Sequence, residues 1–215
     1  MSKIIVGSYT IGMVQTNFYY LHREGGTEAI VFDPADNGEQ IYESLSEQGL
    51  TVKAIFLTHA HFDHIWGANE LRSLTKAPLY ACAAEKELCE DADVNCSREC
   101  GRPYTVVPDR YLADGAAVTA AGITVKLMET PGHTVGSACY YIDNEESEPA
   151  QHILISGDTL FEESVGRTDL PTGSTSALIR SIRDRLFELP DDTVVYPGHG
   201  GETTIGHEKK YNAFV

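Results

Sequence analysis

Three histidines and one aspartate lie close together in the segment HAHFDH at residues 59–64. Buried imidazoles and carboxylates are costly unless they are hydrogen-bonded or bound to a metal, and both groups are standard ligands of zinc and neighbouring transition metals. If the segment turns toward a helix at Asp63, His59 and His61 point to one metal. Asp63 and His64 then reach a second metal, so the spacing suits two metals better than one.

Three further segments each supply one candidate ligand beside a glycine. His133 lies in TPGHT, Asp158 in SGDT and His199 in YPGHG. Each segment follows a predicted strand, and the catalytic groups of open α/β proteins gather at strand ends. One Gly–His turn alone is more often structural, but the four segments together predict a metal site.

The elements around these segments alternate between strand-like and helix-like patterns, which predicts a layered α/β architecture. Runs of β-branched and aromatic residues predict strands at 3–9, 16–22, 27–32, 52–57, 78–82, 123–128, 138–142, 152–155 and 193–196. Apolar residues at helical spacing predict helices at 37–48, 65–74, 83–90 and 174–189, the first of them closed by Gly49. We interpret residues 91–110 as a long surface excursion and the acidic run 143–148 as a solvated hairpin loop.

Taken in order, the candidate ligands resemble the signature of the metallo-β-lactamase superfamily: His59, His61, Asp63, His64, His133, Asp158 and His199. This resemblance implies an α/β fold of the αββα four-layer sandwich type. The length of the chain predicts a single domain over residues 1–215. The segments GRTDLP at 166–171 and TTIG at 203–206 are similar to those of compact glyoxalase II relatives, the hydroxyacylglutathione hydrolases.

The resemblance also implies a role for each ligand. The first metal would be held by His59, His61 and His133, the second by Asp63, His64 and His199, with Asp158 bridging the two. We expect two divalent metal ions, with zinc as the first expectation and iron or manganese as alternatives. Asp63 and Asp158, together with a bridging hydroxide, would be the catalytic groups. The net positive charge of such a centre would attract an anionic or electron-rich substrate.

Similarity to glyoxalase II implies hydrolysis of a small thioester or ester, with S-D-lactoylglutathione as one candidate substrate. The longer enzymes of that family carry a C-terminal helical domain that contributes much of the glutathione site, whereas this chain ends soon after His199. The nearest candidates for contacting a substrate carboxylate are Arg167, Lys209 and Lys210. For Arg167, a salt bridge to Asp169 is the structural alternative.

Two other functions remain open from the sequence. Persulfide dioxygenases share this fold and a Gly-Arg-Thr-Asp segment, but they use a single iron held by the equivalents of His59, His133 and Asp158. The full set of seven ligands favours two metals over this arrangement. The other alternative is a non-catalytic metal-binding domain, and the intact ligand set argues against it.

Composition and charge exclude several classes of partner. The 16 Lys and Arg residues against 32 Asp and Glu residues give a net charge of −16, the wrong sign for a nucleic-acid-binding protein. The absence of a long apolar run and of a signal-peptide pattern predicts a cytoplasmic protein without a membrane partner, and this disfavours β-lactam hydrolysis. The five cysteines fit reduced thiols, and the spacing of Cys82, Cys89, Cys96 and Cys100 matches no usual zinc pattern. Both a monomer and a small homo-oligomer are compatible with the sequence.

Overall fold

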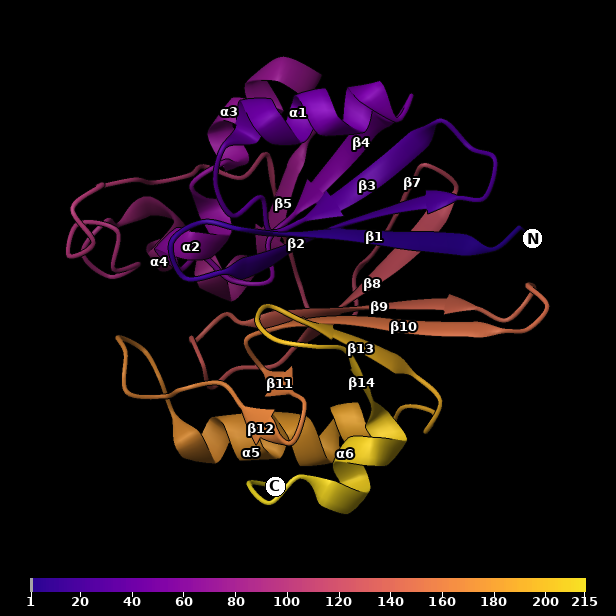
Figure 1. The fold of residues 1–215 in the computed structure, drawn as a ribbon. Helices are drawn as coiled ribbons and strands as arrows, with labels where there is room; N and C mark the ends of the chain where they lie inside the picture. Colours follow the sequence, from indigo (N-terminus) through magenta and orange to yellow (C-terminus); the bar gives the residue numbers. More distant parts are fainter. Residues whose placement is uncertain (1) are drawn as a thin grey trace.

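A computed structural model describes residues 2–215, which form two six-stranded sheets packed face to face, with helices on both outer sides (Figure 1). The outer helices are α1 (Gly38–Glu47) and α3 (Ala68–Thr75) on the first sheet, and α5 (Thr175–Asp184) and α6 (Ile205–Tyr211) on the second. The αββα four-layer sandwich expected from the sequence is therefore confirmed.

The two sheets come from successive halves of the chain. The first sheet runs in the order β1 (Ile4–Ile11), β2 (Thr16–Arg23), β3 (Glu28–Phe32), β4 (Thr51–Phe56), β5 (Leu79–Cys82) and β6 (Arg110–Leu112). The second runs in the order β14 (Thr203–Thr204), β13 (Val194–Pro197), β10 (Gln151–Gly157), β9 (Ala138–Asn144), β8 (Ile123–Glu129) and β7 (Ala117–Ala120). A small hairpin, β11 (Leu160–Phe161) and β12 (Ser164–Val165), follows β10.

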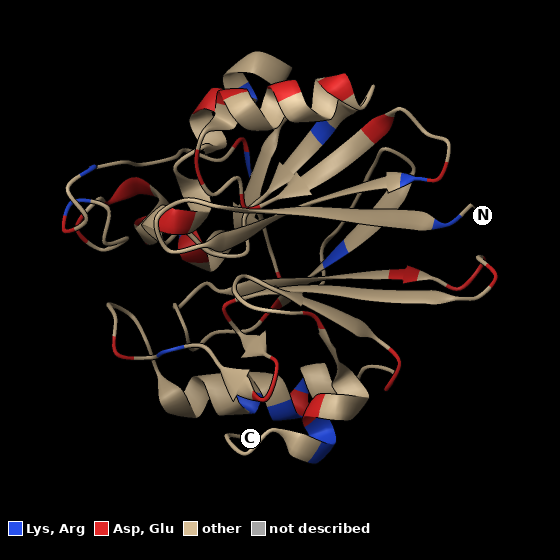
Figure 2. Ribbon diagram, in the orientation of Figure 1, with Lys and Arg blue, Asp and Glu red and all other residues tan. Residues whose placement is uncertain are grey.

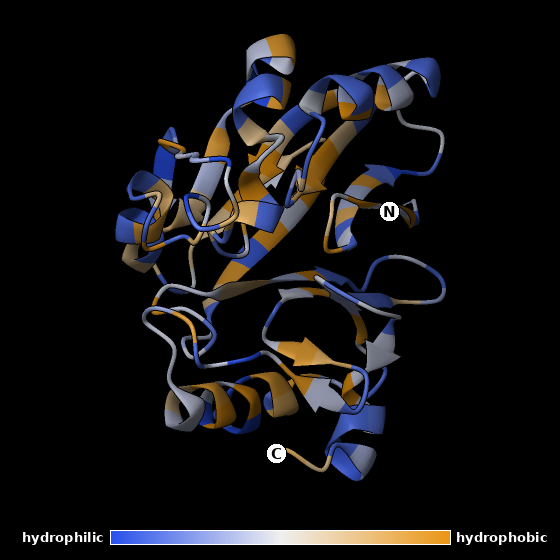
Figure 3. Ribbon diagram, turned by 60° about the vertical axis from the view of Figure 1, so that its left-hand side comes forward, coloured by the Kyte–Doolittle hydropathy of each residue, from blue (hydrophilic) through white to orange (hydrophobic). Residues whose placement is uncertain are grey.

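Side chains of the central strands divide between two cores because successive residues point to opposite faces of a sheet. Val31 and Ile55 pack with residues of α1 and α3, whereas Phe32 and Phe56 face the second sheet. Between the sheets, the ring centroids of Phe32, Phe56 and Tyr140 lie 5.2 to 5.5 Å apart. Figure 3 shows the apolar residues concentrated along the strands and on the inner side of α5. This packing fixes the sheet ends from which the candidate ligands project.

The end of α1 follows the sequence prediction. Gly49 adopts a left-handed φ of +75°, and its N–H donates to the carbonyl of Ser46 at 2.9 Å. The N–H of Leu50 donates to the carbonyl of Leu45, also at 2.9 Å. These two bonds satisfy carbonyls that would otherwise be free at the helix end. The chain then enters β4, which runs parallel to β3 and delivers residues 59–64 to the carboxyl end of the sheet.

Two predicted helices are shorter in the structure. The helix predicted at 65–74 is split into α2 (Phe62–Ile65) and α3, because Gly67 packs its backbone against Pro34, whose carbonyl accepts its N–H at 2.8 Å. A Cβ at Gly67 would lie only 2.8 Å from the same oxygen. The helix predicted at 174–189 ends at Asp184, because the backbone of Arg185 leaves helical geometry with φ −127° and ψ −55°. The Arg185 side chain donates to the carbonyl of Glu129 at 2.8 Å.

Short elements account for the remaining differences from the prediction. The segment predicted as a helix at 83–90 forms a 3₁₀ turn η1 (Ala83–Glu85) followed by α4 (Lys86–Glu90), and η2 (Leu186–Glu188) follows α5. The sequence patterns missed β6, β7, β11, β12, β14 and α6, which are too short to show a clear periodicity. The acidic run 143–148 does connect the hairpin of β9 and β10, as predicted.

Charged residues are distributed unevenly over the fold. Figure 2 shows acidic residues on both outer layers and in the loops, while several basic residues gather on α5 and α6. Within residues 2–215, no helix combines the length and the apolar composition that crossing a membrane requires.

Candidate metal centre

The candidate ligands converge at one end of the two sheets. His59 and His61 follow β4, Asp158 follows β10 and His199 follows β13. Because β10 and β13 are parallel neighbours, their carboxyl ends lie side by side and bring Asp158 and His199 together. His133 arrives on the turn after β8. The structure thus brings all seven predicted ligands into a single cluster of three overlapping groups: His59, His61 and His133; His59, His64 and Asp158; and Asp63, His64 and His199.

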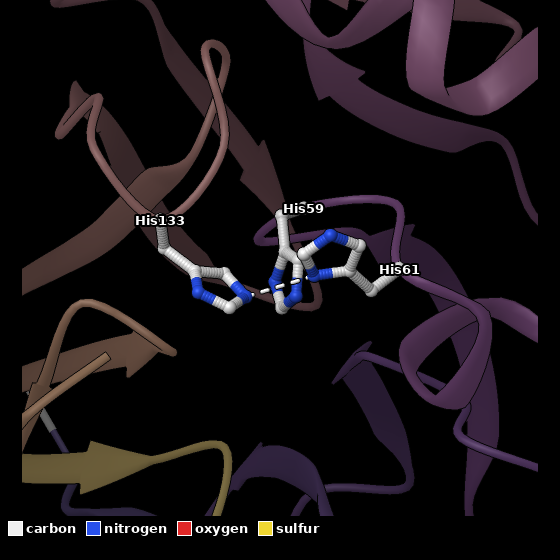
Figure 4. A group of neighbouring side chains, drawn as sticks. All are labelled: His59, His61 and His133. Atoms are coloured by element: carbon white, nitrogen blue, oxygen red, sulfur yellow. Dashed lines mark hydrogen bonds between the residues drawn. The ribbon is translucent and has the colours of Figure 1, made fainter. Parts of the chain in front are cut away.

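The first group consists of three buried imidazoles (Figure 4). His61 Nδ1 lies 2.8 Å from His133 Nε2, and the ring of His59 stands edge-on to both rings, with centroids 4.8 and 4.7 Å away. Burial lowers the pKa of all three, that of His61 to about 3. These imidazoles are therefore neutral near pH 7, the form in which a ring nitrogen can bind a metal.

The second group mixes carboxylate and imidazole. His64 Nε2 lies 3.5 Å from Asp63 Oδ2, and His199 Nε2 lies 3.3 Å from the same oxygen. Burial opposes charge on His64, but the surrounding carboxylates prevail and raise its pKa well above the usual value. For His199, hydrogen bonds to Asp158 and Asp63 likewise outweigh burial and raise the pKa to about 9. Without a metal, His64 and His199 are therefore protonated near neutral pH, and both imidazolium rings contact the carboxylate of Asp63.

Asp158 lies between the two groups. One of its oxygens, Oδ1, lies 3.4 Å from His64 Nε2, while Oδ2 lies 3.4 Å from His199 Nε2 and 3.7 Å from His133 Nε2. Although burial disfavours the anion, the neighbouring imidazoles hold the pKa of Asp158 well below its usual value. Oδ1 therefore faces the second group, whereas Oδ2 faces a ligand of each group, and a carboxylate in this position has the chemistry of a bridging ligand.

Unpartnered polar atoms test whether these residues fit a metal. Within residues 2–215, five buried side-chain nitrogen or oxygen atoms lack a hydrogen-bond partner, and four belong to this cluster: His59 Nε2, His61 Nε2, His64 Nε2 and Asp158 Oδ1. Buried polar groups are almost always paired, so their concentration in one place requires an explanation. Metal coordination would satisfy His59 Nε2, His64 Nε2 and Asp158 Oδ1, whereas His61 faces His133 with Nδ1. The nitrogen and oxygen chemistry of these donors suits zinc, iron or manganese.

Two residues that hold the ligands were missed in the sequence. Asp33, only 2% exposed, accepts hydrogen bonds from Thr58 N at 2.7 Å and from Thr58 Oγ1 at 2.6 Å, and its Oδ2 lies 2.9 Å from His64 Nδ1. Thr16 Oγ1 donates to Asp63 Oδ2 at 2.7 Å. A signal for Asp33 existed, because it directly follows the strand predicted at 27–32, as the ligands follow theirs.

Asn17 holds the turn that carries His199. Its side-chain amide donates to the carbonyls of Pro197 and Gly200 at 3.0 and 2.9 Å, and its backbone N–H donates to Gly198 at 2.7 Å. The close approach also requires glycine at 198, because a Cβ there would overlap Asp158 Oδ1 and lie 2.7 Å from His64 Cε1. The start of β2 and the absence of a side chain at 198 therefore fix the second group.

The three predicted substrate contacts have different surroundings. The carbonyl of Arg167 lies 2.8 Å from His133 Nδ1, so its backbone touches the cluster. Its exposed guanidinium pairs with Asp169 at 2.7 and 2.8 Å, the structural alternative named from the sequence. Lys209 pairs with Asp191, and Lys210 lies 4.8 Å from the ring centre of Tyr211, both on α6 and with no described contact to the cluster.

Comparison with known proteins identifies the family. Residues 11–199 match the model of the metallo-beta-lactamase superfamily. This chain belongs to that superfamily. Among its relatives in this superfamily is the "Probable metallo-hydrolase YqgX" of Bacillus subtilis, 37% identical over 95% of this chain and 94% of that protein. Another is "Hydroxyacylglutathione hydrolase GloC" of Haemophilus influenzae, 31% identical over 87% of each chain.

Solved structures of the superfamily agree with this assignment. BLEG-1, described as a B3 metallo-beta-lactamase, superposes with a TM-score of 0.89 at 38% identity and covers 98% of this chain and 99% of its own. TTHA1623 in a di-iron-bound form gives a TM-score of 0.81 at 34% identity, over 97% and 100% of the two chains. ETHE1 from Myxococcus xanthus gives 0.75 at 28% identity, over 97% and 83%. A protein described as a B3 metallo-beta-lactamase and a protein solved in a di-iron-bound form therefore share this fold at 38% and 34% identity.

Proposed function

We propose that this chain is a binuclear metallo-hydrolase that cleaves a small thioester into a carboxylic acid and a thiol. The observation that carries the proposal is the division of seven donors into a neutral three-histidine group and a carboxylate-containing group around Asp158. The similarity to a protein named as a hydroxyacylglutathione hydrolase supports a hydroxyacyl thioester as substrate. S-D-lactoylglutathione is therefore the first substrate to test.

The proposed ligand sets follow the two groups. The three-histidine group would hold the first metal, Asp63, His64 and His199 would hold the second, and Asp158 would bridge them. We propose zinc, and the di-iron form of the similar TTHA1623 makes iron the first alternative. When bound, the metal pair would supply hydroxide near neutral pH and polarise the substrate carbonyl.

The residues of the chain have three tasks in this reaction. The carboxylates of Asp63 and Asp158 stay ionised near neutral pH, because neighbouring histidines lower their pKa values in spite of burial. Thr16 and Asp33 orient the second group by their hydrogen bonds to Asp63 and His64. The leaving thiolate needs little protonation, so the site requires no dedicated general acid. Arg167 is the strongest of the three substrate-binding candidates, because its backbone already contacts His133.

Replacement of the bridging carboxylate tests the proposal. Asp158→Ala removes the carboxylate that faces ligands of both groups, so we expect metal content and thioester hydrolysis to fall together. Asp184→Ala, at an exposed position on α5, is the matched control and should leave both unchanged. An Asp158→Ala protein with two metals and near-normal turnover would contradict the bridging role.

A mono-iron oxidoreductase is the second candidate, because its three ligands lie in the same cluster. His59, His133 and Asp158 would hold the iron, and His133 Nε2 lies 3.7 Å from Asp158 Oδ2. Oxygen consumption with glutathione persulfide distinguishes this activity from hydrolysis. A β-lactam belongs in the same substrate panel, since the similar BLEG-1 is described as a B3 metallo-beta-lactamase.

A further inference from the structure

Glu85 is a buried carboxylate that the proposed chemistry does not use. It lies in η1, after β5, and only 1% of its surface is exposed. No Lys, Arg or His among residues 2–215 forms a salt bridge with it. Burial of an unpaired carboxylate is costly, and it raises the pKa of Glu85 to about 7. Such a residue needs a compensating set of hydrogen bonds.

The partners of Glu85 come from both halves of the molecule. Its Oε1 accepts the backbone N–H of Ala60 at 2.9 Å, and Ala60 stands between His59 and His61. Its Oε2 accepts the backbone N–H of Gly136 at 2.9 Å. The hydroxyl of Thr134, the residue after His133, lies 3.0 and 2.9 Å from the two oxygens. One carboxylate therefore joins the two backbone segments that carry the three-histidine group.

The surrounding backbone leaves little room for another arrangement. A Cβ at Gly136 would overlap the backbone of Ala84 and Glu85, so this loop lies directly against η1. The hydroxyl of Thr134 is also 2.7 Å from Ser137 Oγ, which keeps the loop closed on itself. The spacing between His61 Nδ1 and His133 Nε2, 2.8 Å, depends on how these two segments are held relative to each other.

We propose that Glu85 is a positioning residue for the three-histidine metal site, and that it sets the separation between the His59–His61 segment and the His133 loop. The inference rests on the proposed ligand assignment. Glu85 contacts no ligand of the second group, which is held instead by Thr16, Asn17 and Asp33. Its loss should therefore weaken one metal site and spare the other, whereas a merely structural residue would affect both.

The substitution Glu85→Gln isolates the hydrogen-bonding role. The two backbone N–H groups bond to different oxygens, and an amide offers one acceptor oxygen in place of two. One N–H would then face the amide NH₂ group, and one of the two segments would move. Residues behind metal ligands typically contribute tenfold to hundredfold in metal affinity, so we expect about a tenfold loss at this site.

Zinc affinity is measured by competition with a chromophoric chelator in two parent backgrounds. In the His199→Ala background, the three-histidine site is the stronger zinc site. In the His61→Ala background, the second group is the stronger zinc site. We expect Glu85→Gln to weaken zinc binding about tenfold in the first background and less than twofold in the second. Glu87→Gln, an equal charge change at an exposed position of α4, is the matched control and should change neither.

Other outcomes overturn the inference. Equal losses in both backgrounds, or no loss in either, would contradict a site-specific role for Glu85. If the His199→Ala parent itself bound no zinc, the ligand assignment would fail. If that parent bound zinc and its affinity were unchanged by Glu85→Gln, only the inference about Glu85 would fail. If Glu85→Gln does not fold, Thr134→Val keeps the carboxylate and removes one partner. We then expect a severalfold loss in the first background alone, and an unchanged affinity there would overturn the inference.

Discussion

Asp33→Asn is the perturbation whose direction follows most directly from the geometry. The Oδ1 atom of Asp33 accepts the N–H of Thr58, while Oδ2 accepts the Thr58 hydroxyl and lies 2.9 Å from His64 Nδ1. A His64 ring that donates through Nδ1 to this carboxylate would have Nε2 available for a metal once the second proton is displaced. That nitrogen is one of the unpartnered atoms of the cluster.

An amide can be placed at this position in two orientations, and both are unfavourable. With its NH₂ group in place of Oδ2, the amide would donate to His64 Nδ1 and shift the ring proton to Nε2, where it blocks metal binding. With NH₂ in place of Oδ1, the amide would face the N–H of Thr58, which leaves a buried donor unpaired at about 1 to 3 kcal/mol. The first orientation lowers metal affinity directly, and the second destabilises the loop before His59.

We expect a tenfold to hundredfold loss of zinc affinity at the second site, about 1.4 to 2.8 kcal/mol. The assay is chelator competition on the metal-free protein, with thermal unfolding of the same sample to separate loss of metal from loss of fold. Asp184→Asn, an exposed carboxylate on α5, is the matched control. Unchanged affinity at both sites, or a loss confined to the three-histidine site, would refute the reasoning from the His64 tautomer.

Three further predictions follow from the same geometry. Gly198→Ala should abolish metal binding at the second site, because the new Cβ overlaps Asp158 Oδ1 and crowds His64. Elemental analysis measures the metal content, and two metals per chain in this variant would contradict the prediction. Zinc binding at pH 7 should release protons, because the pKa of His199 is raised to about 9 in the metal-free protein and a bound cation must displace that proton. Calorimetry in two buffers of different ionisation enthalpy measures the release, which should fade as the pH rises past 9; equal heats in both buffers would count against it. Arg167→Ala should raise KM for an anionic thioester severalfold with little change in kcat, and an unchanged KM would remove Arg167 from the substrate site.

The convergence of the candidate ligands was predictable because the signal at residues 59–64 is local. Three imidazoles and a carboxylate within residues 59–64 have few explanations other than a metal, and each later ligand follows a strand beside a glycine. The C-terminal end of α1 was predictable for the same reason, since Gly49 occupies the position where left-handed backbone closes a helix. Where a feature depends on the composition and spacing of a few neighbouring residues, the sequence alone was sufficient to predict it.

Apart from Asp33, the supporting residues were not predictable, because their roles depend on contacts between distant segments. Glu85 is separated from Ala60 by 25 residues and from Gly136 by 51, and nothing in its own sequence marks it as buried. Tertiary contact also overrode local pattern in the two shortened helices. Gly67 interrupts one of them by packing on Pro34. In the other, the backbone leaves helical geometry at Arg185, whose side chain contacts the distant Glu129.

The measurement that tests the central claim most directly is metal content per chain of protein purified without added metal. Hydrolysis of S-D-lactoylglutathione and oxygen uptake on glutathione persulfide are recorded on the same sample. The binuclear hydrolase predicts close to two metals, thiol release from the thioester and no oxygen uptake. About one iron with persulfide-dependent oxygen consumption would contradict it, and Asp63, His64 and His199 would then be supporting residues rather than ligands.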